Sequence, residues 1–142
     1  MEKLIIDAHS HLWLTQDTQV NGLPIYQLEP NRSRSMFLGE ERQMLPPFMT
    51  DGQNTAERFL SNMDYAQVAA AVVTQEFIDG LQNDYLLQVE QRYPNRFFTF
   101  GMADCRESGF SAHADRLMKD FKGIKVPAAR LPLHFLNDEM VK

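Results

Sequence analysis

The sequence of 142 residues is poor in cysteine, in basic charge and in long apolar runs, and each shortage excludes a class of protein. Its one cysteine, Cys105, excludes an internal disulfide framework and an all-cysteine zinc site, and it favours a reducing compartment. Lysine and arginine number 14 against 19 aspartates and glutamates, so the net charge is −5 and we expect neither nucleic acid nor a membrane surface as partner. The longest apolar run, residues 68–73, is far shorter than the roughly 18 residues of a spanning helix. Since Asp7 also interrupts the N-terminal apolar stretch at once, no signal peptide is expected, and the default location is cytoplasmic.

Length and composition predict a single domain over residues 1–142. Hydrophobic residues make up 44% of the chain, which is enough for one core. Short apolar runs alternate with segments of helical periodicity. The runs predict strands at residues 4–8, 68–74, 97–102 and 123–126. The periodic segments predict helices at about residues 55–66, 83–93 and 114–121, with Asn83 as a cap and a further helix beginning at 137–139.

Residues 15–54 separate the first predicted strand from the first helix and are rich in glycine and proline. This composition predicts one long loop that overhangs the end of the first strand. Arg32, Arg34 and Arg42 are available there to recognise a substrate carboxylate, but a solvated surface role is favoured for each of them individually. For the loop as a whole, a role in covering the substrate is favoured. The apolar residues 44–49 fit either a lid over a pocket or packing against the rest of the protein.

The alternation of apolar strands with amphipathic helices predicts an α/β fold with parallel strands. Two architectures fit it, a small doubly wound sheet and the N-terminal (β/α)4 portion of a (β/α)8 TIM barrel, which needs about 250 residues in full. A flavodoxin-like binding domain is disfavoured, since no glycine-rich phosphate loop follows the first strand.

The segment Asp7-Ala8-His9-Ser10-His11 ends the first predicted strand. Residues two apart in a strand share a face, so His9 and His11 point the same way with Cα atoms roughly 6.6 Å apart. Two imidazoles that converge at a strand end can share one divalent metal ion. The same spacing also arises by chance in surface or packed histidines, and the position at the end of a parallel strand favours the metal.

The segment from Leu4 to Trp13 resembles the opening strand of amidohydrolase-superfamily enzymes. Later segments resemble the branch that includes aminocarboxymuconate-semialdehyde decarboxylase-like proteins. These are Met63-Asp64 with the strand after it, Asn83-Asp84-Tyr85, Arg92-Tyr93-Pro94-Asn95-Arg96-Phe97, and Phe121-Lys122-Gly123-Ile124-Lys125-Val126. The resemblance covers nearly the whole chain except residues 15–54.

This resemblance implies a (β/α)8 barrel with a divalent metal ion, most often zinc, held by His9 and His11. It implies hydrolysis of a small carboxylated or cyclic substrate by a metal-activated water, or non-oxidative decarboxylation as the alternative. The family also takes groups from a fifth-strand histidine and an eighth-strand aspartate, and we find no counterpart of either. The competing hypothesis is therefore a truncated, non-catalytic half-barrel that acts as an assembly module.

Other residues are weaker candidates for the same site. Trp13 and Lys125 are assigned to substrate binding, Lys125 because a charge inside a strand needs a partner or the barrel interior. Asp7 fits either a role behind the ligands or a local backbone contact. Four more residues are considered as ligands and disfavoured, namely Asp104, Cys105, His113 and His134.

The expected partners follow from the incomplete barrel. A half-barrel leaves strand edges unpaired and an apolar face uncovered. We therefore expect a homo-oligomer or association with a complementary C-terminal barrel half, in addition to a small-molecule substrate.

Overall fold

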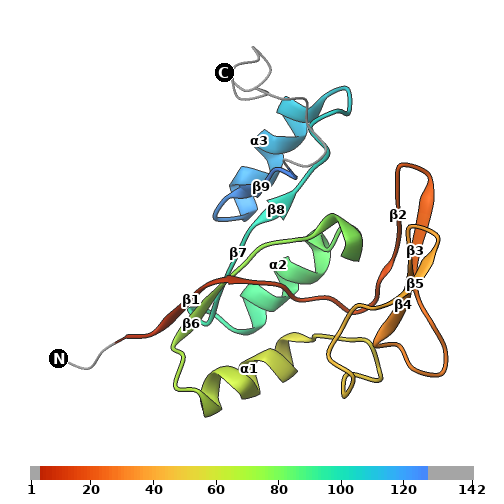
Figure 1. The fold of residues 1–142 in the computed structure, drawn as a ribbon. Coiled ribbons are helices and arrows are strands. Elements are labelled where there is room, and N and C mark those ends of the chain that lie inside the picture. The colour runs from red at the N-terminus through yellow and green to blue at the C-terminus, as the bar shows by residue number, and fades with distance from the viewer. Residues whose placement is uncertain (1–3, 128–142) are drawn as a thin grey trace.

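A computed structural model describes residues 4–127 of the chain. Within this part, strands and helices alternate along the chain (Figure 1). The elements of this alternating part are β1 (Ile6–Ser10), α1 (Ala56–Tyr65), β6 (Ala70–Val73), α2 (Asn83–Arg92), β7 (Phe97–Thr99), β8 (Gly101–Met102), α3 (Phe110–Asp120) and β9 (Ile124–Lys125). They agree with the predicted strands and helices to within a few residues at most ends.

All strand pairs of this alternating part are parallel. β1, β6 and β7 lie side by side in that order, and β8 pairs with β9. α1 connects β1 to β6 after the intervening segment, and α2 connects β6 to β7. The predicted α/β class with parallel strands is therefore confirmed for this alternating part of the described residues.

The starts of α1 and α2 are held by different side-chain contacts. The Thr55 side chain accepts a hydrogen bond from the Arg58 backbone N–H at 3.3 Å and so caps α1. The prediction that Asn83 caps α2 is wrong, because Gln82 occupies the cap position. The Asn83 amide instead donates to the Met102 carbonyl and accepts from the Met102 N–H, at 3.0 and 2.9 Å. Asn83 thus joins the start of α2 to β8.

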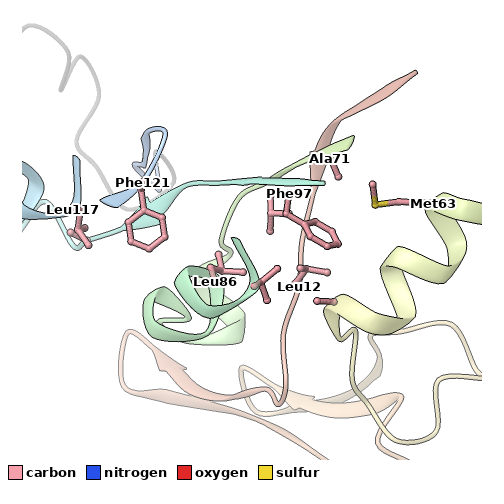
Figure 2. Packing of buried hydrophobic residues seen from close by; sticks show 11 residues of the cluster. Leu12, Met63, Ala71, Leu86, Phe97, Leu117 and Phe121 are labelled. Carbon is pink, nitrogen blue, oxygen red and sulfur yellow. The ribbon is translucent and has the colours of Figure 1, made fainter. Parts of the chain in front are cut away.

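The hydrophobic core lies between the parallel strands and their helices. Figure 2 shows Met63 of α1, Leu86 of α2 and Phe97 of β7 in this layer. Leu86 and Phe97 are fully buried, and Leu117 and Phe121 extend the core toward α3. By contrast, most of β1 is exposed to solvent, including His9.

The prediction of a loop over residues 15–54 is wrong for most of that segment. Residues 17–43 form a four-stranded antiparallel sheet, which lies to one side of the parallel strands (Figure 1). Two-residue turns join its outer strand pairs, with φ of 52° and 78° at Asn21 and Gly22 and of 54° and 90° at Leu38 and Gly39. Positive φ at both positions twists a turn to match the strands. The strands are β2 (Asp17–Val20), β3 (Leu23–Gln27), β4 (Arg34–Phe37) and β5 (Glu40–Gln43).

The segment that carries this sheet leaves and rejoins the parallel part at one point. The Trp13 N–H donates to the Asn54 carbonyl at 3.1 Å, and the Asn54 N–H donates to the Trp13 carbonyl at 3.0 Å. The sheet is also tied to the short 3₁₀ helix η1 (Phe77–Asp79), where the Gln16 amide donates to the Asp79 carboxyl at 2.7 Å.

None of the helices within residues 4–127 is both long enough and apolar enough to cross a membrane. The helix expected to begin at residues 137–139, and His134, lie outside the described residues.

Candidate metal centre

His9 and His11 converge at the end of β1. Their Nε2 atoms are 3.1 Å apart, and their ring centroids are 4.8 Å apart at an interplanar angle of 74°. The pairing of β1 with β6 shifts register between Asp7 and Ser10, which places one extra residue in β1 just before the pair. The predicted convergence of the two rings is confirmed, and their role as metal ligands stays a prediction.

The backbone of β6 fixes the orientation of the His11 ring. The His11 Nδ1 atom lies 3.0 Å from the carbonyl oxygen of Thr74, which is buried. Because a carbonyl oxygen only accepts, Nδ1 donates to it, and in the neutral ring the Nε2 lone pair then faces the Nε2 atom of His9, 3.1 Å away. A metal-ligating histidine typically donates its other ring N–H to such an acceptor.

Glu76 adds a third donor to the pair. One ligand atom each from His9, His11 and Glu76 lies within 4.8 Å of the other two, and this is the group with metal-ligand spacing in the described part of the chain. Neighbouring ligands of one tetrahedral zinc ion stand about 3.3 Å apart. The histidine pair already has this spacing, and two histidines with one glutamate are a known donor set of catalytic zinc. The residues present therefore fit a divalent metal ion.

Sequence reasoning missed Glu76. It lies two residues beyond Thr74, just past the carboxyl end of the second predicted strand. Parallel strands that pair side by side bring their carboxyl ends to one edge, where His9 and His11 also lie. That edge position was the available signal.

Lys125 lies on β9 and pairs with Glu76. Its Nζ atom is 2.6 Å from Glu76 Oε1, and the two side chains are 22% and 38% exposed. The expectation that the charge of Lys125 needs a partner is thus confirmed. Its role in substrate binding stays a prediction.

The remaining residues near the pair make structural contacts. The Trp13 indole N–H donates to the Gly52 carbonyl at 2.8 Å, so its predicted contact with substrate would use the ring face. The Asn54 amide donates to the His11 carbonyl at 2.7 Å and holds the His11 backbone. The Asp7 carboxylate accepts the His9 backbone N–H at 3.1 Å, which is the local contact considered as one of its two roles.

The other candidate ligands of the described part do not join the cluster. Asp104 forms an ion pair with Arg106 at 2.5 Å. Burial raises the pKa of the Cys105 thiol, as does the nearby charge of Asp104, so the thiol stays protonated near neutral pH. His113 lies on α3. None of these three residues belongs to the group formed by His9, His11 and Glu76.

The three arginines of the antiparallel region all have acidic partners. Arg32, Arg34 and Arg42 form ion pairs of 2.7, 2.7 and 2.6 Å, which join them in order to Glu29, Glu41 and Glu40. These contacts match the solvated surface role that was considered for them. The lid role of residues 44–49 stays a prediction.

Comparison with known proteins gives two matches. A family model described as amidohydrolase matches residues 6–140. The crystal structure of a probable 2-pyrone-4,6-dicarboxylic acid hydrolase from Acinetobacter baumannii, with citric acid bound, is similar over 98% of this chain, with a TM-score of 0.60 and 19% identity. The chain spans 43% of the length of that structure's chain. A search of curated proteins found no match.

Proposed function

Because this chain belongs to the amidohydrolase family over residues 6–140, we propose that it forms the N-terminal (β/α)4 portion of a (β/α)8 TIM barrel in a metal-dependent hydrolase. The order of the parallel strands supports this, since β1, β6 and β7 pair in sequence and β9 follows beside β8. The likeness to a hydrolase structure over 98% of the chain supports the same fold. Residues 1–142 then act as one domain.

The observation that carries the proposal is the geometry of the histidine pair. The His9 and His11 Nε2 atoms are 3.1 Å apart, and the Thr74 carbonyl holds the His11 ring so that its Nε2 atom faces His9. We propose that these two side chains hold one divalent ion, with zinc as the expected metal. Such an ion, when bound, lowers the pKa of a water molecule toward 7 and so supplies a nucleophile at neutral pH.

The chain's own residues keep this site in place. The Thr74 carbonyl sets the tautomer of His11, and the Asn54 amide fixes the backbone at the same residue. Glu76 supplies the third protein donor that catalytic zinc sites generally have. The ligands thus come from the ends of β1 and β6, whose pairing sets their spacing.

The substrate that we propose is a small carboxylated or cyclic molecule. The solved structure similar to this chain is that of a probable hydrolase of a dicarboxylic acid, and it contains citric acid. Lys125, beside Glu76, places an ammonium group near the histidine pair, and Trp13 follows His11 by two residues. We assign both residues to substrate binding on this basis.

The test is a His9→Ala, His11→Ala double variant of the whole protein. We expect it to lose stoichiometric metal, measured by mass spectrometry of the bound element, and to lose hydrolysis of carboxylated lactones and amides. His113→Ala is the matched control, since it removes a histidine of α3 outside the cluster. A double variant that kept both metal and turnover would rule out the assignment. Release of carbon dioxide without hydrolysis would assign decarboxylation instead.

A second role, assembly, is supported by the exposure of β1. Within the described residues β1 pairs with β6 alone, and Leu4, Ile5 and Ile6 are 73, 50 and 49% exposed. An apolar strand with a free edge is a template for pairing with another chain. We propose that this edge pairs with a second copy or with a complementary C-terminal barrel half. Sedimentation velocity of the 142-residue chain should show self-association that Ile6→Lys reduces, and a monomer at all concentrations would contradict pairing with a second copy.

A further inference from the structure

The Glu76 carboxylate lies near two groups that can each bind it. The Lys125 ammonium is 2.6 Å from Oε1. A ring nitrogen of His9 and one of His11, which could hold a metal ion, also lie within 4.8 Å of a Glu76 carboxylate oxygen. Lys125 lies on β9, and the histidines lie at the end of β1. Glu76 therefore lies near side chains of both strands.

The distances show that Glu76 is placed for the lysine and not yet for a metal ion. A nitrogen–oxygen separation of 2.6 Å is that of a short, charge-assisted hydrogen bond. The three donor atoms are separated from one another by up to 4.8 Å, whereas neighbouring ligand atoms of one tetrahedral zinc ion are about 3.3 Å apart. The histidine pair alone already has the tighter spacing. The carboxylate therefore has to approach the rings before it can act as a ligand.

We propose that Glu76 exchanges partners, pairing with Lys125 in the metal-free protein and moving to the metal ion when one binds. The inference rests on the proposed function, because it takes His9 and His11 as the residues that first anchor the metal. Lys125 is then a positioning residue that competes with the metal for one of its ligands. Its removal should make the carboxylate available and strengthen metal binding.

The experiment is a cobalt(II) titration of the full chain and of three variants, Lys125→Met, Glu76→Gln and the double variant. Calorimetry gives the affinity, and the visible absorption of bound cobalt reports its ligands, so no activity is needed. We expect Lys125→Met to bind cobalt about tenfold more tightly and Glu76→Gln to bind it about 10–100-fold more weakly, as for other changes around metal ligands. In the Glu76→Gln background, Lys125→Met should change the affinity little.

Lys125→Arg is the matched control, because it keeps a cation that can pair with Glu76 and should keep the original affinity. Circular dichroism verifies that each variant folds, and Lys125→Gln replaces Lys125→Met if that variant does not. Unchanged or weaker binding by Lys125→Met would overturn the partner exchange. The partner exchange would also be overturned if Lys125→Met strengthened cobalt binding equally with and without the Glu76 carboxylate. Repulsion between the lysine ammonium and the metal ion would then explain the effect.

The same titration separates this inference from the proposed function. Cobalt binding that survives His9→Ala, His11→Ala would overturn the proposed function. Binding that requires the two histidines but ignores Lys125 would overturn the partner exchange alone. A chain that bound no cobalt in any variant would overturn both.

Discussion

The parallel part of the molecule and the antiparallel sheet are stabilised by different interactions. The parallel part buries large apolar side chains such as Leu86 and Phe97 between strands and helices. In the antiparallel sheet, Ile25 is fully buried, but so are two serines, Ser33 and Ser35. Apolar burial is the main favourable term in folding, whereas a hydrogen bond adds only about 0.5–1.5 kcal/mol net. We therefore expect the parallel part to contribute most of the folding free energy and the sheet to depend more on its attachment to that part.

That attachment includes a buried polar network. The Ser35 hydroxyl donates to the Gln16 amide oxygen at 3.3 Å, and the Gln16 amide nitrogen donates to the Asp79 carboxyl at 2.7 Å. Asp79 lies in η1, three residues after Glu76. The network therefore connects the antiparallel sheet to the segment that carries Glu76, the third donor of the proposed metal site.

The largest effect should come from emptying the core of the parallel part. Phe97→Ala should lower the free energy of unfolding by about 3–5 kcal/mol, since Phe97 is fully buried among residues of α1, α2 and β6. Ile25→Ala, its counterpart in the antiparallel sheet, should promote local unfolding of residues 17–43. Urea unfolding and amide hydrogen exchange measure the two effects. If both variants lowered the global midpoint equally, the two regions would form one cooperative unit.

An intermediate effect is expected at the joint between the two regions. Burial raises the pKa of Asp79 to about 6 from 3.8, against the Gln16 hydrogen bond that lowers it. The folded state thus binds this proton more tightly than the unfolded state, so stability from this group is lost as pH rises from about 4 to 6. This difference between the pKa values of the folded and unfolded states corresponds to about 3 kcal/mol.

Asp79→Asn tests this directly, because the amide keeps an acceptor for Gln16 and carries no charge. The variant should be more stable than the original by up to about 3 kcal/mol at pH 7.5 and nearly equal to it at pH 4. Urea unfolding at both pH values provides the measurement. An equal difference at the two pH values would show that Asp79 does not titrate between them.

The smallest effect is expected on the surface of the antiparallel sheet. The side chains of the Arg42–Glu40 pair are 54% and 70% exposed, and such pairs contribute about 0–1 kcal/mol. Arg42→Ala should therefore change the free energy of unfolding by less than about 1 kcal/mol. A larger loss in urea unfolding would mean that the sheet depends on its ion pairs more than its exposure suggests.

The parallel part could be predicted from the sequence because its elements carry a strong local signal. The apolar residues around β6 and the helical spacing that includes Ala56 and Met63 each follow from burial on one side. The antiparallel sheet lacks such a signal, because all four residues of β5 are exposed and polar. The pair Asn21-Gly22 was a valid hairpin signal, but the flanking residues gave no clear alternation.

The candidate site likewise has a part that the sequence predicts and a part that it does not. His9 and His11 lie two residues apart, so a strand alone brings them together. Glu76 is distant in the chain and reaches them only through the pairing of β1 with β6, which aligns Ser10 with Val73. The Thr74 contact uses a backbone carbonyl, which any residue at that position would supply. Contacts of that kind leave no trace in a sequence.

The closure at Trp13 and Asn54 has a consequence for how such a protein can diversify. Residues 14–53 begin and end at one hydrogen-bonded pair, so insertions or deletions within them leave the span between their flanks unchanged. The entropic cost of closing a longer loop also grows only slowly with its length. Changes in the length of this segment can thus be tolerated during evolution, while Asn54 keeps the His11 backbone where it is.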